Sequence, residues 1–194
     1  ARDLRARMRG VKHPAAALRR LTPSYVGMVA AHVGFALMVM GVTVVSQHSV
    51  ERDLRMIPGD SQTVAGYEFR FRGVDPVAGP NFDADQATFD VYRKGELLTT
   101  LTPQKRRYRA SGQVMTEASI DPGLFRDLFV AMGEPVGDQA WAIRLQYKPM
   151  IRWIWFGALL IGLGGLTTAL DRRYRAVRRE ASTGGLASGL ASDV

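Results

Sequence analysis

Two uncharged apolar stretches limit the fold of this chain more than any other feature. The first runs for 21 residues from Tyr25 to Val45, and the second for 18 residues from Trp153 to Leu170. At about 1.5 Å per residue, a helix over the first stretch covers the roughly 30 Å hydrocarbon core of a bilayer. A buried helix of a soluble protein is the alternative interpretation. We predict two transmembrane helices, over residues 25–45 and 151–170.

Basic residues beside the two stretches predict their orientation. Such residues precede the first stretch and directly follow the second: Arg19, Arg20, Arg172, Arg173 and Arg175. Because loops on the cytoplasmic side carry an excess of Lys and Arg, we expect both termini in the cytoplasm. In a bacterium, this orientation leaves residues 46–148 in the periplasm. The ends are then a basic cytoplasmic segment (1–24) and a basic, disordered cytoplasmic tail (171–194).

The formal net charge of +8 is concentrated at the ends of the chain. Residues 1–23 carry a net charge of +6, whereas residues 46–148 carry −1. A nucleic-acid-binding protein usually places its excess of positive charge on the folded domain, so we expect no nucleic-acid partner. The sequence contains no cysteine, which excludes disulfides, thiolate-bound metal centres and covalent haem attachment to this chain.

The segment between the apolar stretches is predicted to be rich in β-structure. Residues 67–72 alternate aromatic with charged side chains, the pattern of a half-buried strand. Residues 88–92 and 97–101 are expected to form a hairpin in which Gly95 takes a positive φ. Further strands are predicted over 105–115 and 141–147, turns at Asp75-Pro76 and 79–81, and one short helix over 124–130. The predicted fold class is a membrane protein in which two transmembrane α-helices flank a β-rich extracytoplasmic (periplasmic) domain.

His32 is the only residue in either apolar stretch that titrates near neutral pH. Burying an imidazole in hydrocarbon is costly, so a histidine within a membrane span is by default a candidate for function. A neutral imidazole is a common axial ligand of haem iron, which makes haem the leading functional interpretation. A packing histidine, hydrogen-bonded to a neighbouring helix, explains the residue equally well on its chemistry alone.

Helical spacing limits which residue could complete a haem site. Met28 lies four residues from His32 on the same face, whereas two axial ligands must approach the iron from opposite sides. The second apolar stretch contains no histidine or methionine. A second ligand would therefore come from another helix. Glycines form separate stripes that predict close helix packing, at positions 27, 34 and 41 and at positions 157, 162, 164 and 165.

Other candidate site residues carry weaker signals. His48 follows the first stretch and is expected at the outer membrane surface, while His13 is expected in a cytoplasmic loop. The basic run Lys105-Arg106-Arg107-Tyr108-Arg109 could contact haem propionates or an anionic partner, although such a run is more often a solvated face. No phosphate-binding loop or HExxH metal motif is present.

The order of several motifs resembles the C-terminal region of the CcmF family. They are residues 21–28, 31–34, 49–53, 79–81, 115–118, 141–145 and 171–175 and, most closely, Tyr147-Lys148-Pro149-Met150-Ile151-Arg152-Trp153-Ile154-Trp155. CcmF is the haem lyase (cytochrome c synthetase) subunit of the system I cytochrome c maturation machinery. The resemblance extends from about residue 20 to about residue 175.

This resemblance implies a multi-pass protein of the bacterial inner membrane. Such a protein receives haem from the chaperone CcmE and, with CcmH and CcmI, attaches it to apocytochrome c. The family also holds a b-type haem between two transmembrane histidines, through which quinol is thought to reduce the incoming haem. His32 matches the more C-terminal of these two ligands, so the resemblance favours haem ligation over packing.

Several functional parts of the family have no counterpart in this sequence. The tryptophan-rich segment, the two periplasmic histidines and the first transmembrane histidine lie upstream in CcmF. We therefore expect a C-terminal piece of a longer protein, or a naturally split subunit, that does not catalyse haem attachment alone. The alternative is a non-enzymatic, membrane-anchored β-domain that scaffolds a membrane complex.

Overall fold

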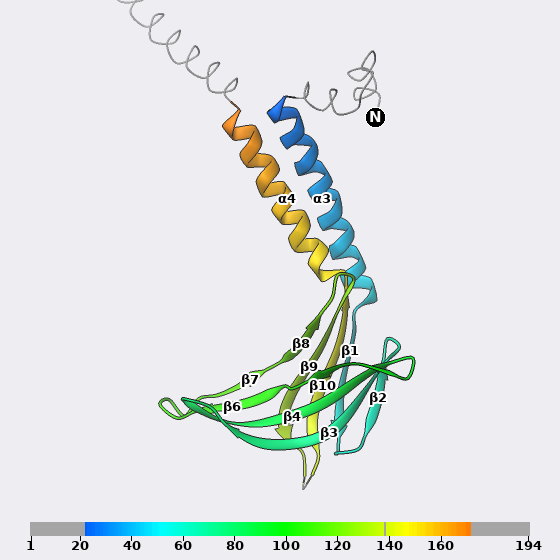
Figure 1. The fold of residues 1–194 in the computed structure, drawn as a ribbon, viewed down its shortest axis with the longest axis vertical. Helices are drawn as coiled ribbons and strands as arrows, with labels where there is room; N and C mark the ends of the chain where they lie inside the picture. Colours follow the sequence, from blue (N-terminus) through cyan, green and yellow to red (C-terminus); the bar gives the residue numbers. More distant parts are fainter. Residues whose placement is uncertain (1–21, 138, 172–194) are drawn as a thin grey trace, which may run out of the picture. The chain divides into compact units, whose positions relative to one another are not determined.

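The computed structural model describes residues 22–137 and 139–171, which contain two helices and ten strands (Figure 1). Helix α3 (Pro23–His48) precedes the strands and helix α4 (Ile151–Leu170) follows them. The chain divides into two compact units. The described residues of the first are 22–39 and 155–171, and the second is Met40–Ile154. The predicted fold class, with two apolar helices flanking a β-rich domain, is confirmed.

The strands form a sandwich of two antiparallel sheets. One sheet has the order β1-β10-β9-β8, and the other has the order β2-β3-β4-β6-β7 with β5 paired to β4. The strands are β1 (Val50–Met56), β2 (Ser61–Val64), β3 (Tyr67–Ala78), β4 (Phe82–Arg93), β5 (Glu96–Leu101), β6 (Gln104–Tyr108), β7 (Val114–Glu117), β8 (Ser119–Pro122), β9 (Arg126–Pro135) and β10 (Trp141–Pro149).

Alternating side chains from both sheets build the core of the sandwich. Tyr67, Phe69 and Phe71 of β3 point inward, as the aromatic–charged alternation predicts. Strand β4 adds Phe89, whose ring stacks on that of Phe71 with 4.8 Å between centroids. The facing sheet contributes aliphatic side chains and two methionines, all buried: Met56, Leu128, Val130, Met132, Ile143 and Leu145.

The predicted hairpin over residues 88–101 is confirmed. Strands β4 and β5 pair in antiparallel register, with Arg93 opposite Glu96. Lys94 and Gly95 form the two-residue turn with φ values of +53° and +85°, the positive pair that a tight hairpin turn requires.

The short helix predicted over residues 124–130 is wrong. Residues 124 and 125 lie in the β8–β9 turn, and β9 begins at Arg126. Apolar residues at 124, 125, 128 and 129 also fit one helical face, and so short a run does not separate the two periods. The next residues decide the outcome, because Leu128, Val130 and Met132 are buried at every second position.

Two further local predictions are wrong. The single strand over residues 105–115 is two strands, β6 and β7, separated by a turn in which Gly112 has a φ of +67°. The turn at Asp75-Pro76 is instead part of β3. Pro76 is opposite Asp85, three positions from the pair Gly79–Phe82, which lies one position beyond the strand end and is joined by a hydrogen bond from Gly79 N to Phe82 O. Alternation along the ladder then directs the proline nitrogen away from β4, so no ladder hydrogen bond is lost.

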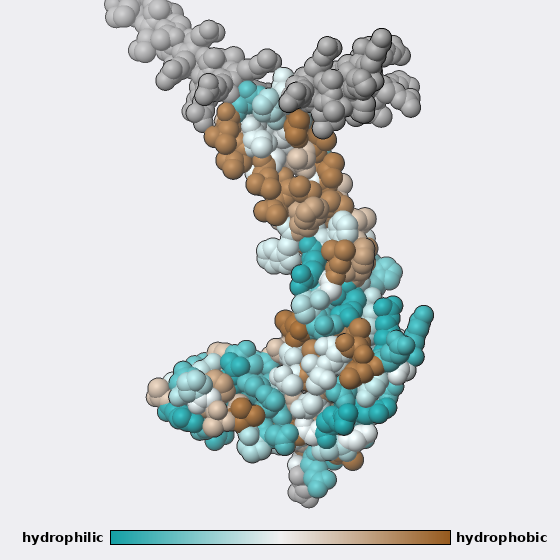
Figure 2. Space-filling view, viewed as in Figure 1, coloured by the Kyte–Doolittle hydropathy of each residue, from teal (hydrophilic) through white to brown (hydrophobic). Residues whose placement is uncertain are grey.

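The two helices are long and apolar enough to cross a membrane. Figure 2 shows a largely hydrophobic surface over the helical segment and a predominantly hydrophilic one over the strands. Within the helical unit, α3 and α4 lie side by side (Figure 1). A Cβ atom at Gly34 would lie 2.6 Å from the carbonyl oxygen of Gly157, so the backbones meet directly there.

The predicted glycine packing is confirmed for only part of the set. The stripe on α3 meets Gly157 and Gly164 of α4, which are buried. Gly162 and Gly165 have no neighbour within 4 Å of an added Cβ in the described residues. Their predicted packing role is not confirmed here.

Candidate functional site

His32 lies on the face of α3 that is turned away from α4. At about 100° per residue, it stands roughly 140° around the helix from Gly27 and 160° from Gly34, the glycines that contact α4. The imidazole is exposed. Its apolar neighbours on this face are exposed as well: Met28, Val29, Phe35 and Val39. The face is therefore open to a partner other than α4.

A hydrogen bond orients the His32 ring. Its Nδ1 lies 2.8 Å from the carbonyl oxygen of Met28, one helical turn earlier. Because a carbonyl oxygen can only accept, Nδ1 carries the proton of the neutral ring, and the lone pair is left on Nε2. A hydrogen bond to the ring nitrogen that does not bind metal is typical of histidine ligands. The carbonyl of Met28 thus has a positioning role that sequence spacing did not reveal.

The chemistry of this face fits a large planar apolar group held by one nitrogen. Nε2 supplies a neutral donor, and Met28 and Phe35 flank it with apolar surface. Helix α4 packs on the opposite side and contains neither histidine nor methionine. Among the described residues there is no cluster of three or more metal-ligating side chains. If this face holds a haem through His32, any further protein ligand would come from outside this helix pair.

The structure does not bring His48 near His32. His48 is the last residue of α3, about four turns beyond His32, and it is exposed. His13 and the basic clusters at 19–20 and 172–175 lie outside the described residues.

The basic run at 105–109 lies on and just after β6 and is largely neutralised by nearby carboxylates. Lys105 pairs with Glu134, Arg106 lies 3.4 Å from Glu117, and Arg109 lies 2.6 Å from Asp83. The hydrogen bond from Arg109 is the main reason that the pKa of Asp83 falls below its usual value. Arg107 is exposed. These pairings favour a structural role for most of the run over capture of an anion.

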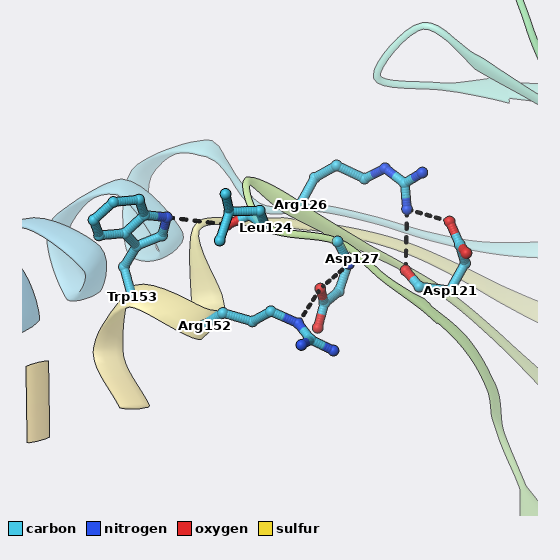
Figure 3. A network of polar contacts seen from close by, with 7 residues as sticks. Asp121, Leu124, Arg126, Asp127, Arg152 and Trp153 are labelled. Carbon is cyan, nitrogen blue, oxygen red and sulfur yellow. Dashed lines mark hydrogen bonds and ion pairs between the residues drawn. The ribbon is translucent and has the colours of Figure 1, made fainter. Parts of the chain in front are cut away.

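The sequence reasoning missed one cluster where the sandwich continues into α4. There the β8–β9 turn is hydrogen-bonded to the first turn of the helix through Leu124 and Trp153 (Figure 3). The available signal is the adjacency of two large apolar residues, Leu124 and Phe125, within residues 124–130, which the sequence predicts to form one short helix.

The fold thus defines a class of protein: a β-sandwich flanked by two apolar helices of membrane-spanning length, with one histidine on an open helix face. Residues 47–149 match the family described as the CcmF C-terminal beta-sandwich. The chain belongs to the CcmF family.

Individual relatives agree with this assignment. The chain is 54% identical over 158 residues to the cytochrome c-type biogenesis protein CcmF of Pseudomonas fluorescens, and 49% identical over 156 residues to that of Escherichia coli strain K12. These matches cover 81% and 80% of the chain and 24% of each relative. The chain therefore spans about a quarter of the length of these relatives.

A solved structure shares the fold. The protein titled "Cytochrome c Heme Lyase CcmF" superposes with a TM-score of 0.61 at 20% sequence identity, covering 76% of this chain and 25% of that one. Two apolar helices and membership of this family fit an inner-membrane protein.

Proposed function

We propose that this chain is the C-terminal part of a cytochrome c haem lyase subunit, and that His32 is one axial ligand of a b-type haem within the membrane. The observation that carries the proposal is the His32–Met28 hydrogen bond on an open apolar face, which leaves Nε2 to bind iron. When bound, the haem would supply electron transfer to the haem that is being delivered. Residues of this chain would orient the imidazole ring of His32 and provide apolar surface beside it.

The proposed placement in the cell follows from the two helices. Both cross the inner membrane, the termini lie in the cytoplasm, and residues 46–148 lie in the periplasm. The uncharged stretches 25–45 of α3 and 153–170 of α4 support this placement, and so does the basic sequence beside them. Reactivity of single cysteines toward an impermeant maleimide tests it. In intact cells with a permeabilised outer membrane, Leu98→Cys should be labelled.

The proposed partners are those of a haem lyase. The remainder of the same protein, or a split partner subunit, supplies the second axial ligand, and quinol supplies electrons. Haem arrives from CcmE and is attached to apocytochrome c with CcmH and CcmI. Support comes from the names of the relatives, which assign them to cytochrome c-type biogenesis.

An absorption spectrum tests the ligand assignment. The native protein, purified in detergent, is compared with His32→Ala and with the matched control His48→Ala, which removes the other histidine of α3. We expect His32→Ala to lose the low-spin b-type Soret and α bands and His48→Ala to retain them. Added imidazole should restore part of the low-spin signal to His32→Ala, because a free ligand can occupy the vacated position.

An unchanged spectrum in a folded His32→Ala protein would reject the assignment. His32 would then be a packing residue, and a scaffolding role for the sandwich would become the better explanation. The scaffolding interpretation predicts that substitutions in the sandwich abolish capture of other Ccm components and leave the haem spectrum unchanged.

A further inference from the structure

Two large apolar side chains project from the β8–β9 turn. Leu124 is 63% exposed and Phe125 is 61% exposed, more than any other large apolar residue in the described part of the sandwich. Scattered single apolar residues on a surface are ordinary, but two adjacent ones at the tip of a turn form a small protruding patch.

The turn is fixed to the start of α4 by two hydrogen bonds. The indole Nε1 of Trp153 donates to the carbonyl oxygen of Leu124 at 3.0 Å, and Met150 N donates to the carbonyl oxygen of Phe125 at 2.9 Å. The rings of Phe125 and Trp153 also stack, with 5.9 Å between centroids. These contacts hold the patch at the level of the first turn of α4 (Figure 3).

The strand-to-helix junction depends on this attachment. Met150 connects Pro149 of β10 to Ile151 of α4 with a φ of +54°, a conformation that a bulky residue rarely adopts. Its N–H is held by Phe125, and its carbonyl accepts from Trp153 N at 3.0 Å. The turn thus forms one piece with the beginning of the helix.

Several polar groups around the patch are paired within the protein. The carbonyls of Leu124 and Phe125 accept the bonds described above, and Gly123 N donates to Asp127 at 3.0 Å. The neighbouring cations are paired too, Arg126 with Asp121 and Arg152 with Asp127. An apolar environment penalises unpaired backbone groups and charges, and these pairings lower that cost.

We propose that the β8–β9 turn is a membrane-inserting loop, with Leu124 and Phe125 seated at the boundary between lipid headgroups and acyl chains. The inference rests on the proposed transmembrane placement of α4, whose first turn lies at that boundary. The exposed Trp155 and the adjacent Lys148 and Arg152 are the aromatic and basic residues that favour this depth. Together with Trp153, the loop makes a second apolar anchor that fixes the sandwich close to the membrane surface.

Depth-dependent fluorescence quenching tests the loop. The sequence has no cysteine, so Leu124→Cys provides a labelling site in this chain for an environment-sensitive dye. The native protein is reconstituted into vesicles of phosphatidylcholine and phosphatidylglycerol. Leu98→Cys on β5, also exposed and apolar, is the matched control. Circular dichroism of each labelled protein verifies the fold.

We expect a nitroxide near the headgroup end of the acyl chain to quench the dye at 124 and not the dye at 98. Quenching by aqueous iodide should be about threefold weaker at 124 than at 98, as for a side chain buried in the interface. Iodide quenching as strong at 124 as at 98 would overturn the inference. Absence of quenching by either agent would overturn it too, and would show that protein covers the patch.

A label at Leu163→Cys, in the middle of α4, separates this inference from the proposed membrane placement. If iodide reaches residue 163, α4 does not span the bilayer and the proposed placement fails. If residue 163 is protected while residue 124 is open to iodide, only the membrane-inserting loop is rejected.

Discussion

The side chain of Asp171 accepts a hydrogen bond from the backbone N–H of Ser24, at 3.1 Å, although the two residues are 147 positions apart. Ser24 is in the first turn of α3, where N–H groups have no partner within the helix. Thr22 serves as the N-cap, because its Oγ1 accepts from Tyr25 N at 3.3 Å, and Pro23 has no N–H to satisfy. Asp171 completes the cap from the far end of α4.

Replacing Asp171 should loosen this end of the helical unit. Asp171→Ala removes both the acceptor and a negative charge at the positive end of a helix, and we expect it to cost about 1 kcal/mol. Hydrogen exchange at residues 24–26, followed by mass spectrometry, should accelerate. Asp171→Asn retains an acceptor oxygen and should show a smaller effect. Equal exchange in all three proteins would contradict a capping role.

The close approach of α3 and α4 predicts that Gly34 tolerates no side chain. Its added Cβ would lie 2.6 Å from the Gly157 carbonyl oxygen and 2.8 Å from Leu160 Cβ, so Gly34→Ala must push the helices apart. Overpacking of this kind costs about 1–3 kcal/mol. Thermal unfolding in detergent should show a lower midpoint for Gly34→Ala. Gly162→Ala, on the open side of α4, should unfold at the wild-type temperature or above it.

The buried pair of Phe71 and Phe89 should dominate the stability of the sandwich. Both rings are fully buried, so Phe89→Ala leaves a cavity and should cost about 3–5 kcal/mol. Phe89→Leu should cost less, because more of the volume remains. Leu97→Ala at an exposed position should change stability by no more than about 0.5 kcal/mol. Urea unfolding followed by circular dichroism compares the three; a Leu97→Ala protein as unstable as Phe89→Ala would contradict this ranking.

Local periodicity predicted those parts of the fold that are decided within a few residues. Alternation from Tyr67 to Arg72 and the position of Gly95 specify a strand and a hairpin without reference to the rest of the chain. The turn at Leu124 and Phe125 could not be predicted in this way, since its conformation depends on Met150 and the first turn of α4. The same limit applies to Asp171, whose partner is almost the full chain away.

At the candidate site around His32, too, some features follow from the local sequence and others depend on the three-dimensional structure. Residue type singles out His32 as a candidate ligand, and helical spacing places Met28 on the same face, but these two features alone leave a packing role for His32 equally open. Assigning the tautomer of His32 required the position of its ring relative to the carbonyl oxygen of Met28, which only the structure provides. Identifying the open face of α3 required the structure, which shows that the glycine side of α3 packs on α4.

Asp90 is the carboxylate whose ionisation should matter most to the sandwich. It is buried, and it accepts hydrogen bonds from Arg72 Nε at 2.7 Å and from Thr100 Oγ1 at 2.9 Å. Burial, the largest single influence, would raise its pKa, but these two hydrogen bonds and the positive charges of Arg72 and Arg70 together outweigh burial and hold the pKa below the ordinary 3.8. Asp90→Asn keeps the shape but loses the charge, and we expect it to cost about 1–3 kcal/mol at neutral pH.

The sign of the pH dependence follows from that lowered pKa. A carboxylate with a lower pKa in the folded than in the unfolded state contributes its full stabilisation above the unfolded value, near 3.8, and loses it as pH falls through the folded value. The stability gap between wild type and Asp90→Asn should therefore be constant from neutral pH to about 5 and shrink below about 4. Urea unfolding of both proteins across this range measures the gap, with Asp85→Asn, an exposed carboxylate of the same strand, as the control. A gap that widens on acidification would mean that the Arg72–Asp90 pair does not stabilise the ionised form.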